Sequence, residues 1–397
     1  MGSEADLDSE LKTLSSLSEH PELYEEFTKL GCVSSLVSLL AHENTDVVID
    51  AIEIISELTD EDVDAEQSQW DVLVDAMLDA DLLSLLTQNL DRLDEDNESD
   101  RGGVYHTLNV LENLASQIRI AELIGLETTI MTWIMNRLKR KAQSTSQNKQ
   151  YAAEVLAILL QSSPANRSHL IKLDGVDILL QLLSIYRKKD PDKGTDEEEY
   201  VENVFDCLTC LVEEAEGKLK FVEAEGVELC MIMLREGNMS RPRALRLLDH
   251  SVGGTDGGQI CEKVVDAAGL KTVFTMFMKK VCTQTFLALM LYALLTNTQQ
   301  DHPTVEHLIG IMAALLRHLP ATSEQRIRTM AKFVEKDYEK ITRLVKFRRE
   351  YAARARLIDD EIKLEQASLS AEHVTARADE WFSRRMDAGL FCLQVLQ

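Results

Sequence analysis

Three small residue clusters in this sequence have types that could do chemistry. Cys207 and Cys210 form a CxxC pair, the glycine-rich residues 251–258 suggest a phosphate loop, and His302 with His307 could bind a metal. A redox CxxC pair lies at a helix N-terminus after a strand, whereas this pair lies inside an apolar helical run. The glycines lack a GK[ST] and a preceding strand, and histidines five apart do not share a helix face. The sequence therefore predicts core packing for the cysteines, a helix end for the glycines and no metal site.

No catalytic signature accompanies these clusters. The sequence contains no HExxH, GxSxG, P-loop or kinase motif, and its carboxylates stand in surface runs. We therefore expect a protein that is not an enzyme, needs no cofactor or metal, and works by binding other proteins. A hydrolase or other enzyme is the disfavoured alternative, which observed turnover of a substrate would revive.

The elements that position these residues should be helices. Apolar residues make up 45% of the 397 residues, aromatic residues make up 5%, and there are 6 prolines, a balance that favours an all-α fold. The longest uncharged apolar run, Phe286–Asn297, is too short to cross a bilayer, so no membrane association is expected. Seven scattered cysteines favour a reducing compartment.

The charge of the chain is concentrated at one end. Residues 1–120 contain 29 acidic and 5 basic side chains, whereas the whole chain has a net charge of -26. A field of this sign repels duplex nucleic acid and attracts Lys/Arg-rich segments. The charge therefore predicts a basic protein partner, although an acidic surface that only keeps the protein soluble is the alternative.

One phrase recurs along the chain, a small turn residue followed by an apolar helix. Copies begin near residues 31, 81, 125, 175, 226 and 269, at separations of 43 to 51 residues. Armadillo and HEAT repeats have periods of about 40–47 residues. A second apolar helix follows each copy, for example Val47–Leu58, and such pairs bury their apolar faces only by stacking on their neighbours. The sequence therefore predicts an all-α armadillo/HEAT-type right-handed superhelical solenoid.

The repeat pattern also predicts the domain organisation. We expect an N-terminal helical cap in residues 1–30, armadillo-type repeats in 31–300, and a C-terminal helical region in 301–397 that stops inside an apolar helix and is truncated. Within that region, residues 326–356 predict a basic helix, either a solvated face or a site for RNA or an acidic partner. Three polar stretches predict loops: residues 59–66, 91–101 and 186–199.

In armadillo repeats the last helix of each unit lines a concave groove and supplies the ligand contacts. The importin-type pattern ALWALSNLA can be laid over His106–Ala115, which puts Asn109 at its Trp position and Asn113 at its Asn position. Corresponding positions in the other units are acidic. The predicted peptide-binding residues are Glu53, Glu57, Asn109, Glu112, Asn113, Glu154 and Asp206.

The indoles that line the importin groove have no counterpart at these positions. None of Trp70, Trp133 and Trp381 falls on them, so carboxylates and amides would have to hold a basic peptide with less cation–π gain. The alternative is that the seven residues are ordinary solvated helix positions.

Five longer strings resemble the beta-catenin-like protein family. They run in the same order over nearly the whole chain and comprise residues Gly31–Asp60, Val104–Asn113, Ala153–Gln161, Ala244–His250 and Arg384–Phe391. The resemblance implies a nuclear protein of the spliceosome's nineteen complex that recognises basic nuclear-localisation-type segments of splicing factors, and vertebrate members look like binders of an antibody-diversifying deaminase. An importin-like nuclear transport adaptor is the alternative function. The oligomeric state stays open, a homodimer included.

Overall fold

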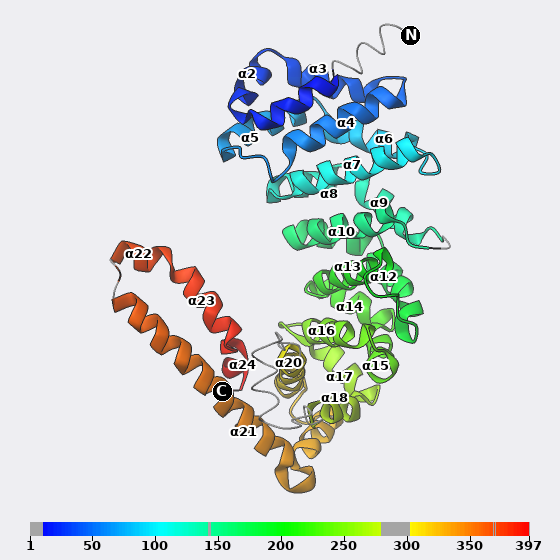
Figure 1. The fold of residues 1–397 in the computed structure, drawn as a ribbon. Coiled ribbons are helices and arrows are strands. Elements are labelled where there is room, and N and C mark those ends of the chain that lie inside the picture. Colours follow the sequence, from blue (N-terminus) through cyan, green and yellow to red (C-terminus); the bar gives the residue numbers. More distant parts are fainter. Residues whose placement is uncertain (1–10, 142–143, 279–301, 368, 370, 397) are drawn as a thin grey trace. The chain divides into compact units, whose positions relative to one another are not determined.

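The computed structural model describes residues 11–141, 144–278, 302–367, 369 and 371–396. This part of the chain consists of helices joined by short turns and contains no strand (Figure 1). No helix within it is long and apolar enough to cross a membrane. The apolar run Phe286–Asn297 lies outside the described residues.

The chain divides into two compact units. The first unit contains residues 1–183 and 191–217, and the second contains residues 184–190 and 218–397.

Four three-helix repeats make up most of the first unit, after the short turns η1 (Ser15–Glu19) and η2 (Pro21–Leu23). The repeats are α2 (Tyr24–Lys29), α3 (Cys32–Ser38) with η3 (Leu39–Ala41) and α4 (Thr45–Thr59); α5 (Gln67–Asp79), α6 (Leu82–Arg92) and α7 (Glu98–Ala115); α8 (Ile118–Glu127), α9 (Ile130–Lys139) and α10 (Gln147–Ser162); α11 (Pro164–Lys172), α12 (Gly175–Leu183) and α13 (Asp196–Leu211).

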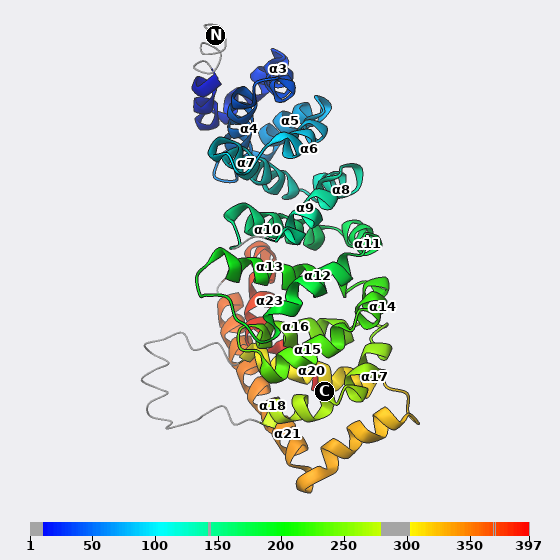
Figure 2. The ribbon, with the colours of Figure 1, turned by 90° about the vertical axis from the view of Figure 1, so that its right-hand side faces the viewer.

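The third helices of these repeats form the core of the first unit. Figures 1 and 2 both show α4, α7, α10 and α13 side by side in sequence order. Val104, Leu108 and Leu111 of α7 are fully buried. Burial of each such side chain stabilises the fold by about 1.5–3 kcal/mol. This row of third helices, α4, α7, α10 and α13, therefore holds the exposed residues of α7 in fixed positions.

A left-handed residue separates the first two helices of most repeats. Gly31, Asp81 and Asp174 have φ values of 74°, 68° and 57°, and the second helices α3, α6 and α12 begin directly after them. These turns coincide with the copies of the phrase that begin near residues 31, 81 and 175. At residue 31 the left-handed residue is the glycine of the phrase itself. At residue 175 the left-handed residue is Asp174, and Gly175 is required because a Cβ atom there would lie 2.6 Å from Cγ of Leu170.

Gly125 has a different role from these left-handed turn residues. It lies inside α8, and the second helix of that repeat begins at Ile130 rather than near residue 125. A Cβ atom on Gly125 would lie 2.1 Å from Oδ1 of Asn166, which is fully buried and donates from Nδ2 to Ala121 O and Leu159 O. Close packing of α8 against α11 therefore requires glycine here.

Two predicted loops are shorter than the sequence suggested. Residues 91–101 include the end of α6 and the start of α7, and residues 186–199 include the start of α13. Asn97 caps α7 by accepting from Ser99 N at 3.0 Å, and the Thr195 side chain caps α13. Acidic side chains are stabilised in the first turn of a helix, so the charged runs extend these helices instead of ending them.

The short first helix of each repeat was not predicted. The shortest of them, α2 and α11, bury few apolar residues; α11 buries Leu170 and Ile171. A start signal was nevertheless present, because Ser163 caps α11 through Ala165 N at 3.1 Å and Pro164 occupies the first helical position. The repeat therefore contains three helices rather than two.

The second unit begins with η4 (Ser184–Arg187), and α14 (Ala215–Glu223) starts in the first unit and continues into it. Its further helices are α15 (Gly226–Glu236), α16 (Ser240–Val252), α17 (Gly258–Asp266), α18 (Gly269–Met278), α20 (His302–His318), α21 (Glu324–Ala367), α22 (Ala371–Ala376), α23 (Ala378–Asp387) and α24 (Leu390–Val395).

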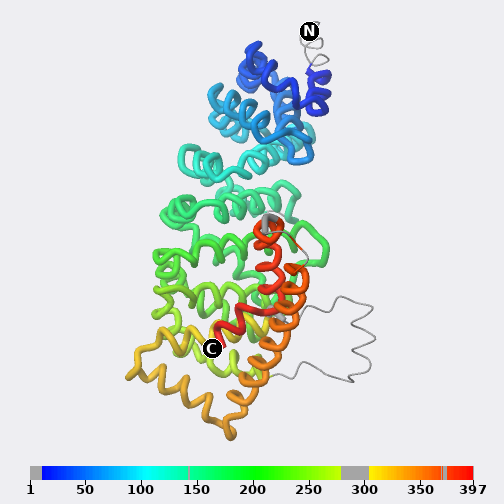
Figure 3. Tube along the Cα trace, turned by 90° about the vertical axis from the view of Figure 1, so that its left-hand side faces the viewer, coloured from blue at the N-terminus to red at the C-terminus, as the bar shows by residue number. Residues whose placement is uncertain are grey.

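The helix α21 is broken at residues 335–338, where three residues adopt left-handed backbone angles. Figure 3 shows the chain turning in this orange part of the tube. Phe333, before the break, packs edge-on against Phe274, with 5.0 Å between the ring centroids. Phe347, after the break, packs against Phe277, with 5.8 Å between the ring centroids. The basic helix that the sequence predicts here is therefore two helices, each anchored on α18.

After the break α21 pairs with α23, which runs back along it. Arg384 lies 3.1 Å from Glu361 and 2.7 Å from Glu365, and Trp381 Nε1 donates to Glu365 at 2.9 Å. These contacts fix the two helices as an antiparallel pair within the second unit.

Candidate binding pocket

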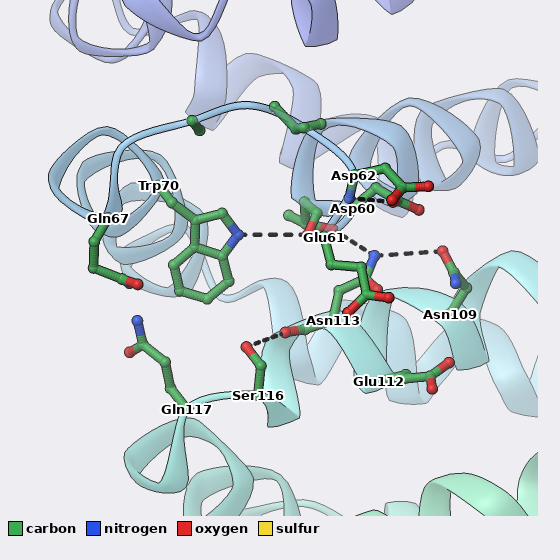
Figure 4. A pocket seen from close by; sticks show the side chains of 13 residues that line it. Asp60, Glu61, Asp62, Gln67, Trp70, Asn109, Glu112, Asn113, Ser116 and Gln117 are labelled. Atoms are coloured by element: carbon green, nitrogen blue, oxygen red, sulfur yellow. Dashed lines mark hydrogen bonds between the residues drawn. The ribbon is translucent and has the colours of Figure 1, made fainter. Parts of the chain in front are cut away.

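A pocket of about 500 Å³ opens beside the C-terminal half of α7 (Figure 4). One side is the loop that joins α4 to α5, and the other sides are the start of α5 and the junction of α7 with α8. The lining residues are Thr59, Asp60, Glu61, Asp62, Val63, Ala65, Gln67, Trp70, Asn109, Glu112, Asn113, Ser116 and Gln117.

Two asparagines of α7 connect the helix to both of its neighbours. Asn109 accepts from Ser56 Oγ of α4 and donates from Nδ2 to the Tyr151 hydroxyl of α10 at 3.0 Å. Asn113 donates from Nδ2 to Ser56 O and to Thr59 Oγ1, both at 3.3 Å. The two amides are thus held in place by α4 and α10, the third helices on either side of α7.

Four carboxylates line the pocket without a cation beside them. Asp60, Glu61, Asp62 and Glu112 take part in no ion pair with any described residue. Asp60 accepts from Asp62 N at 2.9 Å, and Glu112 accepts from the Tyr151 hydroxyl. The pocket therefore carries negative charge that the described protein does not neutralise.

The pKa of Glu112 is raised by its burial and by the negative charge around it. Burial raises the pKa of Glu112; the Tyr151 hydrogen bond lowers it, and the nearby carboxylates of Glu154, Glu61 and Asp60 raise it further, for a net rise. A desolvated carboxyl among like charges is costly to ionise. A cation that entered the pocket would relieve this cost.

One wall of the pocket is an indole from the first helix of the second repeat. Trp70 is half-buried, and its Nε1 donates to Thr59 O at 3.4 Å. Beside it, Gln67 and Gln117 donate from Nε2 to the same Asp71 oxygen at 2.8 and 2.7 Å (Figure 4 shows both amides beside the ring). These hydrogen bonds lower the pKa of Asp71 and hold the wall together.

Three of the residues predicted for peptide binding lie in this pocket. Asn109, Glu112 and Asn113 line it together, on one face of α7. Glu154 of α10 does not line it, but its carboxylate is near enough to raise the pKa of Glu112, and it accepts from Gln150 Nε2 at 2.8 Å.

The other predicted residues lie elsewhere in the first unit. Glu53 and Glu57 are half-buried on α4, and Asp206 is half-buried on α13. None of the three lines the pocket. Their place in a peptide site stays a prediction.

Sequence reasoning missed the acidic loop and the indole. Asp60, Glu61 and Asp62 were interpreted only as part of a loop, and Trp70 was set aside because it lies outside the third helices. The repeat alignment considered only third helices, whereas one side of this pocket is the α4–α5 loop and another is the start of α5, the first helix of the following repeat. The consecutive acidic residues directly after α4 were the available signal.

Cys207, the glycines of residues 251–258 and His307 have structural roles in the described part of the chain. Cys207 is buried in α13 and unpaired, and burial raises the pKa of its thiol, the opposite of what a redox thiolate needs. The glycines from Gly253 to Gly258 end α16 and begin α17. His307 lies 2.9 Å from Asp249. Within the described part of the chain, no group of three or more His, Cys, Asp and Glu side chains could hold a metal.

Comparison with known families gives a match over residues 1–397. The matching family is described as catenin-beta-like, Arm-motif containing and nuclear. The chain belongs to this family. The resemblance noted in the sequence is thereby confirmed, and the family's description as nuclear agrees with the expected localisation.

Curated relatives bear the family name. The chain is 39% identical over 393 residues to the beta-catenin-like protein 1 homolog of Schizosaccharomyces pombe, which covers 99% of this chain and 65% of that protein. It is 37% identical over 404 residues to human beta-catenin-like protein 1, with 99% of this chain and 68% of that protein covered. The chain thus spans about two thirds of the length of these catenin-beta-like relatives.

A solved structure confirms the fold class. The chain is similar, with a TM-score of 0.51 and 13% identity, to a designed armadillo repeat protein in complex with the peptide (KR)4. The likeness covers 71% of this chain and 99% of the designed protein. The catenin-beta-like chain is therefore an all-α armadillo-type protein, as the repeat spacing predicted.

Proposed function

We propose that this chain is a non-enzymatic nuclear scaffold that captures Lys/Arg-rich segments of partner proteins in the pocket beside α7. The partners we propose are splicing factors with basic nuclear-localisation-type segments, in the nineteen complex of the pre-mRNA splicing machinery. The observation that carries the proposal is the set of four pocket carboxylates that have no cationic partner among the described residues.

The physical argument is one of charge complementarity. A basic segment would neutralise Asp60, Glu61, Asp62 and Glu112 together, and the acidic first 120 residues would steer it towards the first unit. Steering of this kind acts mainly on the association rate and weakens with salt. The armadillo fold is compatible with such a ligand, since the similar designed protein was solved with the peptide (KR)4.

The test is a fluorescence titration with a Lys/Arg-rich splicing-factor peptide at low and moderate salt. The pocket variant is Glu61→Gln, Asp62→Asn and Glu112→Gln, which leaves Asp60 in its turn. The matched control is Asp91→Asn, Asp96→Asn and Glu98→Gln, which removes equal charge from exposed residues near the other end of α7.

The control lies far enough from the pocket to separate local from general electrostatics. Glu98 and Glu112 are 14 residues apart on α7, about 21 Å at the usual rise of a helix. We expect the pocket variant to weaken binding about tenfold and the control about twofold or less. Equal losses of affinity in the two variants would show that binding depends only on net charge and not on the pocket. Failure of the wild type to bind the peptide at both low and moderate salt would refute the proposal.

An importin-like transport adaptor is the second candidate. It is favoured by one observation, that Asn113 and an indole, Trp70, line the same pocket. The indole comes from α5 rather than from a third helix, unlike the importin pattern. Binding of this chain to an importin-β-type carrier would support the adaptor, and its absence would leave the scaffold.

A further inference from the structure

Each pocket side chain that carries a hydrogen-bond donor already donates within the protein. Five lining side chains donate from a side-chain nitrogen to a protein oxygen: Trp70, Gln67, Gln117, Asn109 and Asn113. The two lining hydroxyls do the same. Ser116 Oγ donates to Asn113 O at 2.7 Å, and Thr59 Oγ1 donates to Ile55 O at 2.8 Å.

The acceptors of the pocket are largely free. Because Asp71 takes the amide nitrogens of Gln67 and Gln117, the Oε1 atoms of both side chains have no donor among the described residues. The carboxylates of Glu61 and Asp62 are exposed and likewise accept from no described group. The lining thus offers many acceptors around one indole.

A ligand that brings many donors therefore suits this pocket best. The guanidinium group of arginine has five N–H donors in one plane and accepts no hydrogen bond, whereas the lysine ammonium has three donors at a point. A planar guanidinium also stacks on an indole face and loses less hydration than an ammonium when it does so. The lining therefore matches arginine better than lysine.

We propose that the Trp70 pocket is an arginine-selective subsite, in which the guanidinium stacks on the indole and donates to Gln67 Oε1, Gln117 Oε1 and the acidic loop. This inference rests on the proposed function and goes further, because it distinguishes between two residues of equal charge. Trp70 is then the specificity-determining residue, and the carboxylates supply affinity for either cation.

The experiment compares octaarginine and octalysine, which have the same charge and length. Both are titrated at moderate salt against wild type, Trp70→Ala and Trp133→Ala. Trp133 is a matched control because it is also half-buried in the first unit and its Nε1 also donates to a main-chain oxygen, Leu90 O at 3.3 Å, but it does not line the pocket.

We expect wild type and Trp133→Ala to bind octaarginine about threefold to tenfold more tightly than octalysine. In Trp70→Ala this ratio falls to about one, while the affinity for octalysine stays within about twofold. If Trp70→Ala does not fold, Trp70→Leu replaces it, since leucine fills much of the space without a π face.

The outcomes separate the subsite from the proposed function. Equal binding of the two peptides by wild type, or an arginine preference that survives loss of the indole, would overturn the arginine subsite and leave capture of basic segments intact. Failure of both peptides to bind wild type would overturn both. A preference lost in Trp70→Ala and kept in Trp133→Ala supports the subsite.

Discussion

Acidic residues near the two ends of α7 differ in whether they have a cationic partner. Near its N-terminal end, Glu95 faces Arg137, whose Nε lies 2.6 Å from Oε1 and whose Nη2 donates to Oε2 at 2.8 Å. Asn148 donates to the same carboxylate at 3.2 Å. Near its C-terminal end, Glu112 has a hydroxyl partner, Tyr151, and no cation.

The difference shows that carboxylates of one acidic segment can serve separate purposes. The Glu95 side chain is 17% exposed and that of Arg137 is 10% exposed, so their charges are satisfied inside the fold. The carboxylates around Glu112 are left for a ligand. Net charge alone does not distinguish carboxylates with a structural role from those available for binding.

The largest expected effect comes from breaking the paired end. Replacing Arg137 with Ala leaves Glu95 without its cation and removes the hydrogen bond to Ser146 Oγ at the start of α10. We expect a loss of about 3–5 kcal/mol in the free energy of unfolding, measured in urea by circular dichroism. Glu112→Gln, which keeps an acceptor for Tyr151, should change it by about 0.5 kcal/mol or less. Similar losses in the two variants would contradict the comparison.

Two helical glycines, Gly125 and Gly102, test whether the effect of a substitution on stability depends on the packing around the residue. Gly125→Ala places a methyl group against the fixed amide of Asn166 and should cost about 1–3 kcal/mol. Gly102 lies within α7 with open space where its Cβ would be, so Gly102→Ala should stabilise by about 0.5–1 kcal/mol. Thermal unfolding measures both effects, and a destabilised Gly102→Ala would contradict the open space at the Gly102 Cβ position.

The smallest effect concerns the pH dependence of the ligand-binding end. Because the folded pKa of Glu112 is raised, wild type should gain stability relative to Glu112→Gln as the pH falls from neutral through that pKa. Binding of a basic peptide should weaken over the same range, because the carboxyl becomes neutral. Titrations between about pH 7.5 and about pH 5 should show a smaller loss of affinity in Glu112→Gln. An identical pH dependence in both proteins would exclude Glu112 as the titrating group.

Local patterns predicted much of the fold. The phrase beginning near residues 31, 81 and 175 marks second helices because a small or polar residue there adopts a left-handed turn. The long third helices followed from their apolar periodicity. The first helices α2 and α11 were missed because their few buried residues leave little periodic signal, although the cap at Ser163 was present in the sequence. The first helices α5 and α8 bury several apolar side chains each, so their periodic signal was present and was missed.

The candidate site was predicted only where it lies on a third helix. Asn109, Glu112 and Asn113 follow from the repeat alignment because i, i+3 and i+4 share a helix face. Trp70 and the acidic loop could not be assigned in this way. They come to lie beside the end of α7 only after the chain folds, through contacts such as the Gln117 hydrogen bond to Asp71 of α5.

The sequence by itself determined the helical class, the repeat period, the family and the acidity of the first 120 residues, since each depends on residue type and spacing along the chain. Only the tertiary structure decided which carboxylates find a cation. Glu95 meets Arg137 across 42 residues, and Asn113 meets Thr59 across 54. Such pairings depend on how repeats stack, and stacking brings together side chains whose proximity no local pattern encodes.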